Sequence, residues 1–147
     1  MYFTSFPIVL DSSVLLKWIS KEQEDLLEKS SKLFDLLIED KIRVFSPELA
    51  KYEVGNVLVS KIRRGFISYE RAYLALEIFF KLPIVFVAEN AQQSQKTLKI
   101  TKKTKMTYYD ASFVSLAEEL ETKLVTNNYK HQGKFKGVEV IALKDYK

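Results

Sequence analysis

Five short apolar runs, separated by longer segments of helical periodicity, constrain the fold of this 147-residue chain most strongly. Each run is continuously apolar rather than alternating, which is typical of strands that helices cover on both faces. Strands that alternate with helices favour an α/β fold with a mainly parallel sheet. The predicted strands span residues 8–10, 42–45, 84–87, 123–126 and 138–143. Because this length suits one domain, we expect a single domain over residues 1–147.

The segments between these strands have the spacing and the end signals of amphipathic helices. The predicted helices lie near residues 23–39, 48–64, 68–82, 89–103 and 109–121. Ser46 and Ser68 are the hydroxyl residues expected to cap the second and third of these helices. Gly65 is expected to end the second helix, and Pro83 the third.

The absence of cysteine and the presence of only one histidine restrict the chemistry that this chain can perform. Disulfides, thiolate zinc sites, iron–sulfur clusters and cysteine nucleophiles are excluded, and so is a metal site with several histidines. The one histidine, His131, lies in a polar segment and is expected to be a solvated loop residue. Any hydrolytic chemistry must therefore use carboxylates, hydroxyls, amides, lysine or arginine.

Polar residues follow two of the predicted strands directly. Asp11 ends the first apolar run, and the pair Asn127 and Asn128 ends the fourth. Glu53 lies inside the second predicted helix, and Asp110 lies at the start of the fifth. Ligands of open α/β sheets bind beyond the carboxyl ends of the strands. A parallel sheet could therefore bring these residues to one edge.

Taken singly, these residues have ordinary explanations as helix caps, turn residues or solvated helix positions. A cluster of three acids needs a stronger one. Two carboxylates about 4 Å apart repel by about 4 kcal/mol at an effective dielectric constant of about 20, so such a cluster needs protons or cations. With oxygen ligands alone, the expected cation is hard, either Mg²⁺ or Mn²⁺.

Four segments resemble, in order and with similar spacing, the motifs of PIN-domain ribonucleases of the VapC toxin type. These segments are Ile8–Trp18, Pro47–Leu58, Tyr109–Ala117 and Leu124–Asn128. The resemblance implies a Rossmann-like, three-layer α/β/α sandwich and Mg²⁺- or Mn²⁺-dependent cleavage of RNA phosphodiesters by an endoribonuclease. It also implies a homodimer and a cognate antitoxin whose tail covers the site.

The resemblance also assigns roles to individual residues. The catalytic metal ligands that it implies are Asp11, Glu53 and Asp110. The supporting polar residues that it implies are Ser13, Asn56 and Thr126. Position 128 departs from the family, which often has aspartate there. Asn128 can still offer a carbonyl oxygen as a further ligand, but it adds no negative charge.

The formal net charge of +4 and the sequence pI near 9.1 fit a nucleic-acid partner and an ordinary lysine-rich protein equally well. Basic residues lie in the sequence on either side of the acids and could contact RNA phosphates. The expected RNA contacts are Arg63, Arg64, Lys102, Lys103, Lys105 and Lys130. No aromatic RNA-binding motif is present, so base-specific recognition is not predicted.

Other classes of protein fit less well. A nucleotide cofactor is not expected, because the first strand is not followed by a glycine-rich turn. A phosphoaspartate enzyme is disfavoured, because Ser13 stands where a second acid is needed. Asn128 leaves open a different interpretation, a catalytically weak PIN-like module that binds RNA or a protein. Because no targeting or membrane-spanning segment is visible, we expect a soluble cytoplasmic protein without a membrane partner.

Overall fold

The expected strands form one parallel sheet in a computed structural model that describes residues 5–147. The strands are β1 (Phe6–Leu10), β2 (Ile42–Pro47), β3 (Ile84–Val87), β4 (Leu124–Thr126) and β5 (Val140–Ala142). They lie in the order β3-β2-β1-β4-β5, and every neighbouring pair is parallel. The predicted five-stranded parallel sheet is therefore confirmed.

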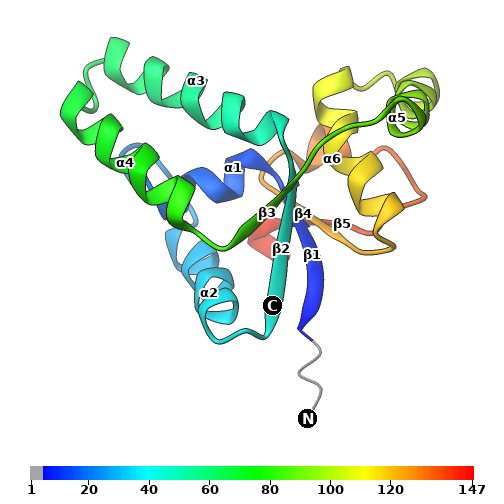
Figure 1. The fold of residues 1–147 in the computed structure, drawn as a ribbon, viewed down its shortest axis with the longest axis horizontal. Coiled ribbons are helices and arrows are strands. Elements are labelled where there is room, and N and C mark those ends of the chain that lie inside the picture. The colour runs from blue at the N-terminus through cyan, green and yellow to red at the C-terminus, as the bar shows by residue number, and fades with distance from the viewer. Residues whose placement is uncertain (1–4) are drawn as a thin grey trace.

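Helices cover both faces of the sheet, as its continuously apolar strands require. The helices are α1 (Ser12–Leu15), α2 (Leu27–Ile38), α3 (Leu49–Arg63), α4 (Tyr69–Lys81), α5 (Ala91–Thr104), α6 (Tyr108–Glu119) and α7 (Tyr129–Gln132). Two short 3₁₀ segments are η1 (Leu16–Trp18) and η2 (Leu143–Asp145). Figure 1 shows α1–α4 on one side of the sheet and α5 and α6 on the other, which confirms the three-layer α/β/α sandwich.

The direction of strand addition reverses at β1. The chain adds β2 and β3 on one side of β1 and then returns to place β4 and β5 on the other side. Asp11 follows β1 and Asn127 follows β4, and these two strands are paired neighbours. Both residues therefore emerge at the carboxyl edge of the sheet, at the topological switch point where open sheets bind ligands.

Two of the predicted helix starts, at Ser46 and at residue 23, are wrong. Ser46 is not a helix cap: it belongs to β2, and its Oγ donates a hydrogen bond to the main-chain oxygen of Leu10 at 2.9 Å. The first predicted helix begins at Leu27 rather than residue 23, since the preceding Leu26 has a left-handed conformation with φ of 52°.

The end signals around the turn between α3 and α4 are confirmed. The Oγ of Ser68 accepts a hydrogen bond from the main-chain N–H of Arg71 at 3.1 Å and so caps α4. Gly65 has φ of +78°, a conformation that suits glycine at the end of a helix. These two residues fix a tight reversal between the two helices.

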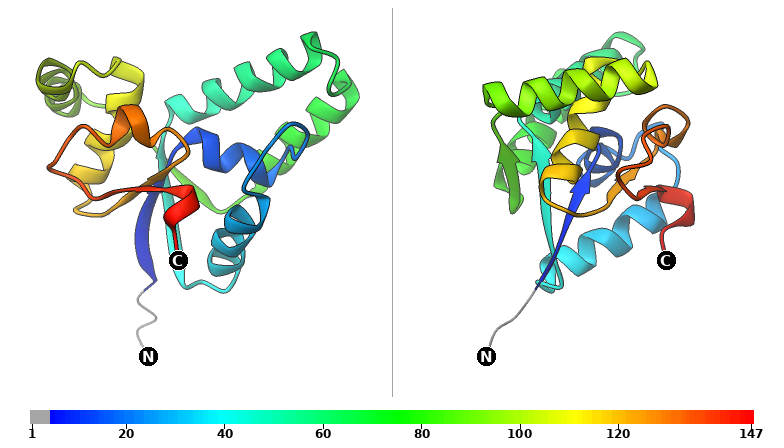
Figure 2. Two further views of the ribbon diagram at one scale, coloured as in Figure 1. Left: turned by 180° about the vertical axis from the view of Figure 1, so that it is seen from behind. Right: turned by 90° about the vertical axis from the view of Figure 1, so that its right-hand side faces the viewer.

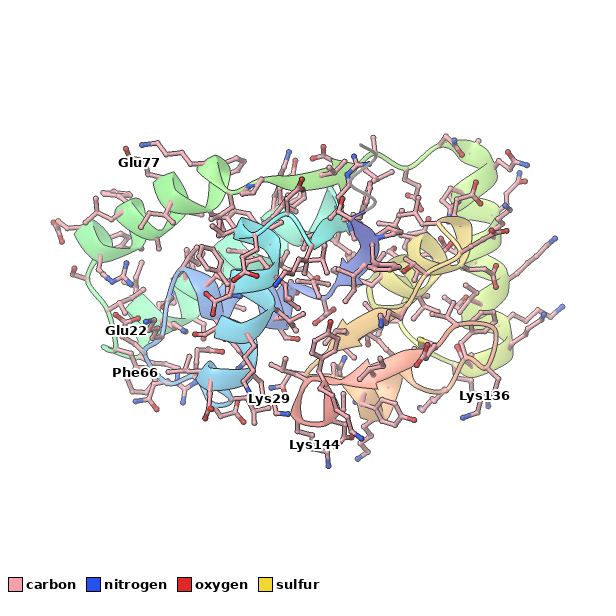
Figure 3. All side chains as sticks on the ribbon, turned by 90° about the horizontal axis from the view of Figure 1, so that it is seen from below. Glu22, Lys29, Phe66, Glu77, Lys136 and Lys144 are labelled. Atoms are coloured by element: carbon pink, nitrogen blue, oxygen red, sulfur yellow. The ribbon has the colours of Figure 1, made fainter. Side chains whose placement is uncertain are left out.

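A single apolar core lies between the sheet and its helices, and it includes the fully buried Val9 and Leu10 of β1. The C-terminal segment packs beside α2 (Figure 2), where Nζ of Lys29 donates to the main-chain oxygen of Tyr146 at 2.6 Å. Figure 3 shows the same region from below, with Lys29 near Lys144. Within residues 5–147, no helix is both long enough and apolar enough to cross a membrane.

A buried ion network ties the segment between η1 and α2 to the core. Nζ of Lys17 contacts Glu24 Oε1 at 3.1 Å and Asp25 Oδ1 at 2.9 Å, although the Lys17 side chain is only 1% exposed. Nζ of Lys61 in α3 contacts the other carboxylate oxygen of Glu24 at 3.0 Å, and also Oγ of Ser20 at 3.0 Å. The two buried ammonium groups are therefore paired, as buried charges must be.

Candidate active site

Asp11 is the buried carboxylate of the site. It lies directly after β1, and only 5% of the residue is exposed. Its Oδ2 accepts a hydrogen bond from the main-chain N–H of Ser13 at 3.0 Å, and its Oδ1 accepts one from Nε2 of Gln132 at 3.1 Å. Burial raises the pKa of Asp11, and the bonds from Ser13 and Gln132 offset part of this rise.

Glu53 approaches the same edge of the sheet from α3. Its Oε1 accepts a hydrogen bond from the hydroxyl of Ser12 at 3.1 Å, which links α3 to the first turn of α1. Partial burial raises the pKa of Glu53, and the negative charges of Asp11 and Asp110 raise it further. The bond from Ser12 therefore brings Glu53 to the residue that follows Asp11.

Asp110 lies in the first turn of α6. Thr107 caps this helix, since its Oγ1 accepts a hydrogen bond from the main-chain N–H of Asp110 at 3.1 Å. The carboxylate accepts a hydrogen bond at Oδ1 from Nδ2 of Asn128, across 3.2 Å. Asn128 is therefore beside the acids, as expected, and its amide contacts an acid.

Two of the predicted supporting residues hold the turn after β4. Oγ of Ser13 accepts a hydrogen bond from the main-chain N–H of Asn127 at 3.1 Å. Oγ1 of the fully buried Thr126 accepts one from the main-chain N–H of Asn128 at 2.8 Å. Asn56 differs from these two residues. It is exposed on α3, and within residues 5–147 it makes no hydrogen bond to any of the three acids.

Two polar residues that contact the acids, Ser12 and Gln132, are not among the predicted site residues. Gln132 is fully buried in α7. Its neighbour His131 is exposed as predicted, but it belongs to this short helix rather than to a loop. The main-chain N–H of Gln132 donates to the main-chain oxygen of Asn128 at 3.1 Å. No local signal in the sequence indicates Gln132, because its side chain contacts Asp11 from 121 residues away.

The donor atoms of this site suit a hard divalent cation, since the acids and amides offer only oxygen ligands. Among the residues that the structure describes, no three acidic or histidine side chains are close enough to enclose an ion by themselves. Mg²⁺ is ordinarily held by one or two carboxylates and retains several waters or substrate oxygens. The arrangement therefore fits a hydrated ion rather than an ion fully enclosed by protein.

The basic residues predicted to contact RNA lie at different distances from the acids. Lys130 lies in α7, close in sequence to Asn128, and is exposed. Arg63 and Arg64 lie at the far end of α3, roughly 15 Å along the helix axis from Glu53 at 1.5 Å per residue. The remaining three cluster around the end of α5 and are exposed: Lys102, Lys103 and Lys105.

Comparisons with known proteins agree with this architecture. A curated relative, Ribonuclease VapC3 from Pyrobaculum aerophilum, is 28% identical over 123 residues, which cover 81% of this chain and 87% of the relative. The crystal structure of VapBC2 from Rickettsia felis bound to a promoter DNA fragment has a TM-score of 0.71 at 15% identity, covering 93% of this chain and 98% of that one.

A toxin-antitoxin complex from Klebsiella pneumoniae is also similar, with a TM-score of 0.64 at 14% identity and coverage of 95% of this chain and 99% of that one. At such identities these two structures support the fold. The sequence model of the PIN domain matches residues 8–136. The resemblance seen in the sequence motifs is thereby confirmed, and this chain belongs to the PIN-domain family.

Proposed function

We propose that this protein is a metal-dependent endoribonuclease that hydrolyses RNA phosphodiesters, and that it is the toxin of a toxin–antitoxin pair. One observation carries the proposal. Hydrogen bonds link the three acids: Nε2 of Gln132 contacts Asp11 Oδ1 and the main-chain oxygen of Asp110, and the hydroxyl of Ser12, next to Asp11, contacts Glu53. Membership of the PIN-domain family and the similarity to Ribonuclease VapC3 support the same activity.

The acids are assigned as ligands of Mg²⁺ or Mn²⁺, with the carbonyl oxygen of Asn128 as a further candidate. When bound, the ion lowers the pKa of water and stabilises negative charge on phosphoryl oxygens. Asp11 is the best-oriented ligand, because two N–H donors fix its carboxylate. The hydroxyl of Ser12 orients Glu53 in the same way.

Asp110 is the acid assigned to orient the attacking water. Its side chain is only partly buried, so that solvent can reach it, and Asn128 fixes one of its two carboxylate oxygens. Thr126 and Ser13 act indirectly, because they fix the turn that carries Asn128. Asn56 remains assigned as a supporting polar residue on α3.

The proposed substrate is single-stranded RNA, which the exposed basic residues would hold through its phosphates. We also propose a cognate antitoxin, since similar folds occur in a toxin-antitoxin complex, together with a homodimeric assembly. We further propose that the protein is a single PIN-like domain over residues 1–147 and that it acts in the cytoplasm. It uses no nucleotide cofactor.

One observation favours the second candidate function, a PIN-like module that binds RNA or a protein but cleaves weakly. The amide of Asn128 donates to an oxygen of Asp110 that a cation would otherwise use. Asn128 also supplies no negative charge for a second divalent ion. This candidate predicts RNA binding without cleavage, and cleavage that appears only in Asn128→Asp.

Cleavage of single-stranded RNA by Asp11→Asn, Glu53→Gln and Asp110→Asn tests the proposal. Each variant should lose at least about 100-fold in rate, because each removes a charged oxygen ligand. Asp35→Asn is the matched control, since Asp35 is exposed on α2 and should retain the wild-type rate. Unchanged cleavage by Asp11→Asn would reject this site.

A further inference from the structure

Gln132 has a hydrogen-bonding pattern that packing alone does not explain. The residue is fully buried, and its Nε2 donates to Asp11 Oδ1 at 3.1 Å and to the main-chain oxygen of Asp110 at 3.3 Å. Its Oε1 is buried and, within the described part of the chain, has no hydrogen-bond partner. Gln132 thus uses both of its N–H donors at the site and leaves its acceptor unpaired.

The two acceptors determine which way this amide faces. An ionised carboxylate and a main-chain carbonyl can only accept hydrogen bonds. Turning the amide over would place Oε1 against both acceptors and would break both bonds. The orientation of Gln132 therefore follows from the chemistry of its neighbours.

Packing alone does not favour glutamine at position 132, because Oε1 is buried without a partner in the described part of the chain. A buried acceptor without a partner costs about 1–3 kcal/mol, whereas an apolar side chain of similar shape avoids that cost. Methionine has nearly the same length and would fill the position. The amide is therefore explained by what its N–H groups do, and both of them contact residues that carry the acids of the site.

The two contacts join residues that are far apart in the sequence. Asp11 directly follows β1, whereas Asp110 belongs to the first turn of α6. One planar amide spans both, and α7 carries it at a fixed spacing from Asn128. Gln132 therefore sets the position of the Asp11 carboxylate relative to the helix turn that carries Asp110.

We propose that Gln132 is a positioning residue, whose amide holds Asp11 and the first turn of α6 in the arrangement that binds the divalent ion. The inference rests on the proposed function, because it concerns the same site. Residues that orient metal ligands through hydrogen bonds typically contribute about 10- to 100-fold to metal affinity or activity. Gln132 acts through Asp11 and the main chain of Asp110, so it need not contact the ion or the RNA.

Mn²⁺ binding to Gln132→Met, measured by calorimetry, tests this inference. We expect Mn²⁺ affinity to fall by about 10- to 100-fold, with RNA cleavage recovering in part at saturating Mn²⁺. Gln93→Met is the matched control, because Gln93 uses its Nε2 on Ser115 of α6 and, within residues 5–147, makes no hydrogen bond to the three acids. The control should bind Mn²⁺ as tightly as the wild type does.

Wild-type affinity in a folded Gln132→Met would overturn the inference while leaving the proposed function intact. Failure of the wild-type protein to bind Mn²⁺ would overturn both. If Gln132→Met does not fold, the NMR signals of the Gln132 side-chain amide are followed in the wild-type protein as Mg²⁺ is added. Shifts that saturate with Mg²⁺ support positioning, and signals that do not move at saturating Mg²⁺ contradict it.

Discussion

The side-chain amide of Asn128 donates a hydrogen bond to Oδ1 of Asp110 across 3.2 Å, so a neutral residue sits against an acid of the site. The turn that carries Asn128 is fixed by Thr126, whose hydroxyl accepts the main-chain N–H of Asn128 at 2.8 Å. An aspartate at this position would place a second carboxylate beside Asp110. We therefore expect the residue at 128 to affect stability without metal and affinity for metal in opposite directions.

Asn128→Asp should lower stability without metal and raise affinity for Mn²⁺. The change removes a hydrogen bond to a charged group, worth about 1.5–3 kcal/mol, and adds repulsion with Asp110. Melting in EDTA should therefore occur several degrees lower than in the wild type, and Mn²⁺ should restore more stability than it does in the wild type. A variant that is more stable in EDTA would contradict this account.

The pH dependence of stability should reveal the raised pKa values of Asp11 and Glu53. Burial raises the pKa of Asp11 above its ordinary value of 3.8 and that of Glu53 above 4.5. The folded state then binds these protons more tightly than the unfolded state does. The two protonated carboxyl groups therefore stabilise the folded state below their ordinary pKa values, and this stabilisation is lost as the pH rises through their pKa values in the folded state. Urea unfolding in EDTA from pH 4 to pH 8 measures this loss.

Asp11→Asn isolates the contribution of Asp11 to that profile. The stability of the variant relative to the wild type should rise as the pH increases from 4 to 8 in EDTA. The wild type must ionise the buried Asp11 over this range, whereas the neutral asparagine does not titrate. A stability difference that stays constant across this range would show that the burial of Asp11 does not raise its pKa.

Lys17 should be a major contributor to stability even though it is charged. Lys17→Met leaves Asp25 without its cation and Glu24 with only Lys61. Breaking a buried ion pair typically costs about 3–5 kcal/mol. Because Lys61 still pairs with Glu24 in the variant, we expect a loss of about 3 kcal/mol in the free energy of unfolding. The free energy of unfolding in urea measures it.

Lys81→Met is the control for Lys17→Met. Lys81 pairs with Glu77 at 3.1 Å, but its side chain is 74% exposed. Exposed pairs contribute less than about 1 kcal/mol, so this variant should lie within about 0.5 kcal/mol of the wild type. Equal losses in the free energy of unfolding would show that the buried pairs of Lys17 contribute no more to stability than the exposed pair of Lys81 does.

The parts of the fold and the site that follow local signals could be predicted from the sequence. Apolar runs and the polar residues that end them identified the strands, and the parallel topology then placed Asp11 and Asn128 at one edge. The roles of the acids in α3 and α6 follow from the family resemblance. That these acids form one metal site with Asp11 stays a prediction.

The contacts that could not be predicted join residues far apart in the sequence. Gln132 contacts Asp11 from 121 residues away in the sequence, and Lys61 of α3 contacts Glu24, which precedes α2. No local period or cap signal marks such pairs, because tertiary burial creates them. Lys61 lies two residues before Arg63 in α3, and only the fold shows that its side chain is buried.

Lys130 should contribute more to RNA binding than basic residues remote from the acids. Each phosphate contact to a single strand changes the slope of log affinity against log salt by about 0.7. Lys130→Ala should therefore reduce the magnitude of that slope by about 0.7, measured with an uncleaved RNA in EDTA.

Lys41→Ala is the matched control, since Lys41 precedes β2 at the opposite edge of the sheet and is exposed. Its slope should equal that of the wild type. Equal slopes for all three proteins would place the RNA away from α7.

The most direct test of the central claim is cleavage of single-stranded RNA by the wild-type protein as Mn²⁺ is added after treatment with EDTA. The account predicts no cleavage in EDTA and cleavage that rises with Mn²⁺ to a plateau, at concentrations where calorimetry shows Mn²⁺ binding. Cleavage that persists in EDTA would contradict the role of the metal. Mn²⁺ binding without any cleavage would contradict the assignment of a nuclease and favour the binding module.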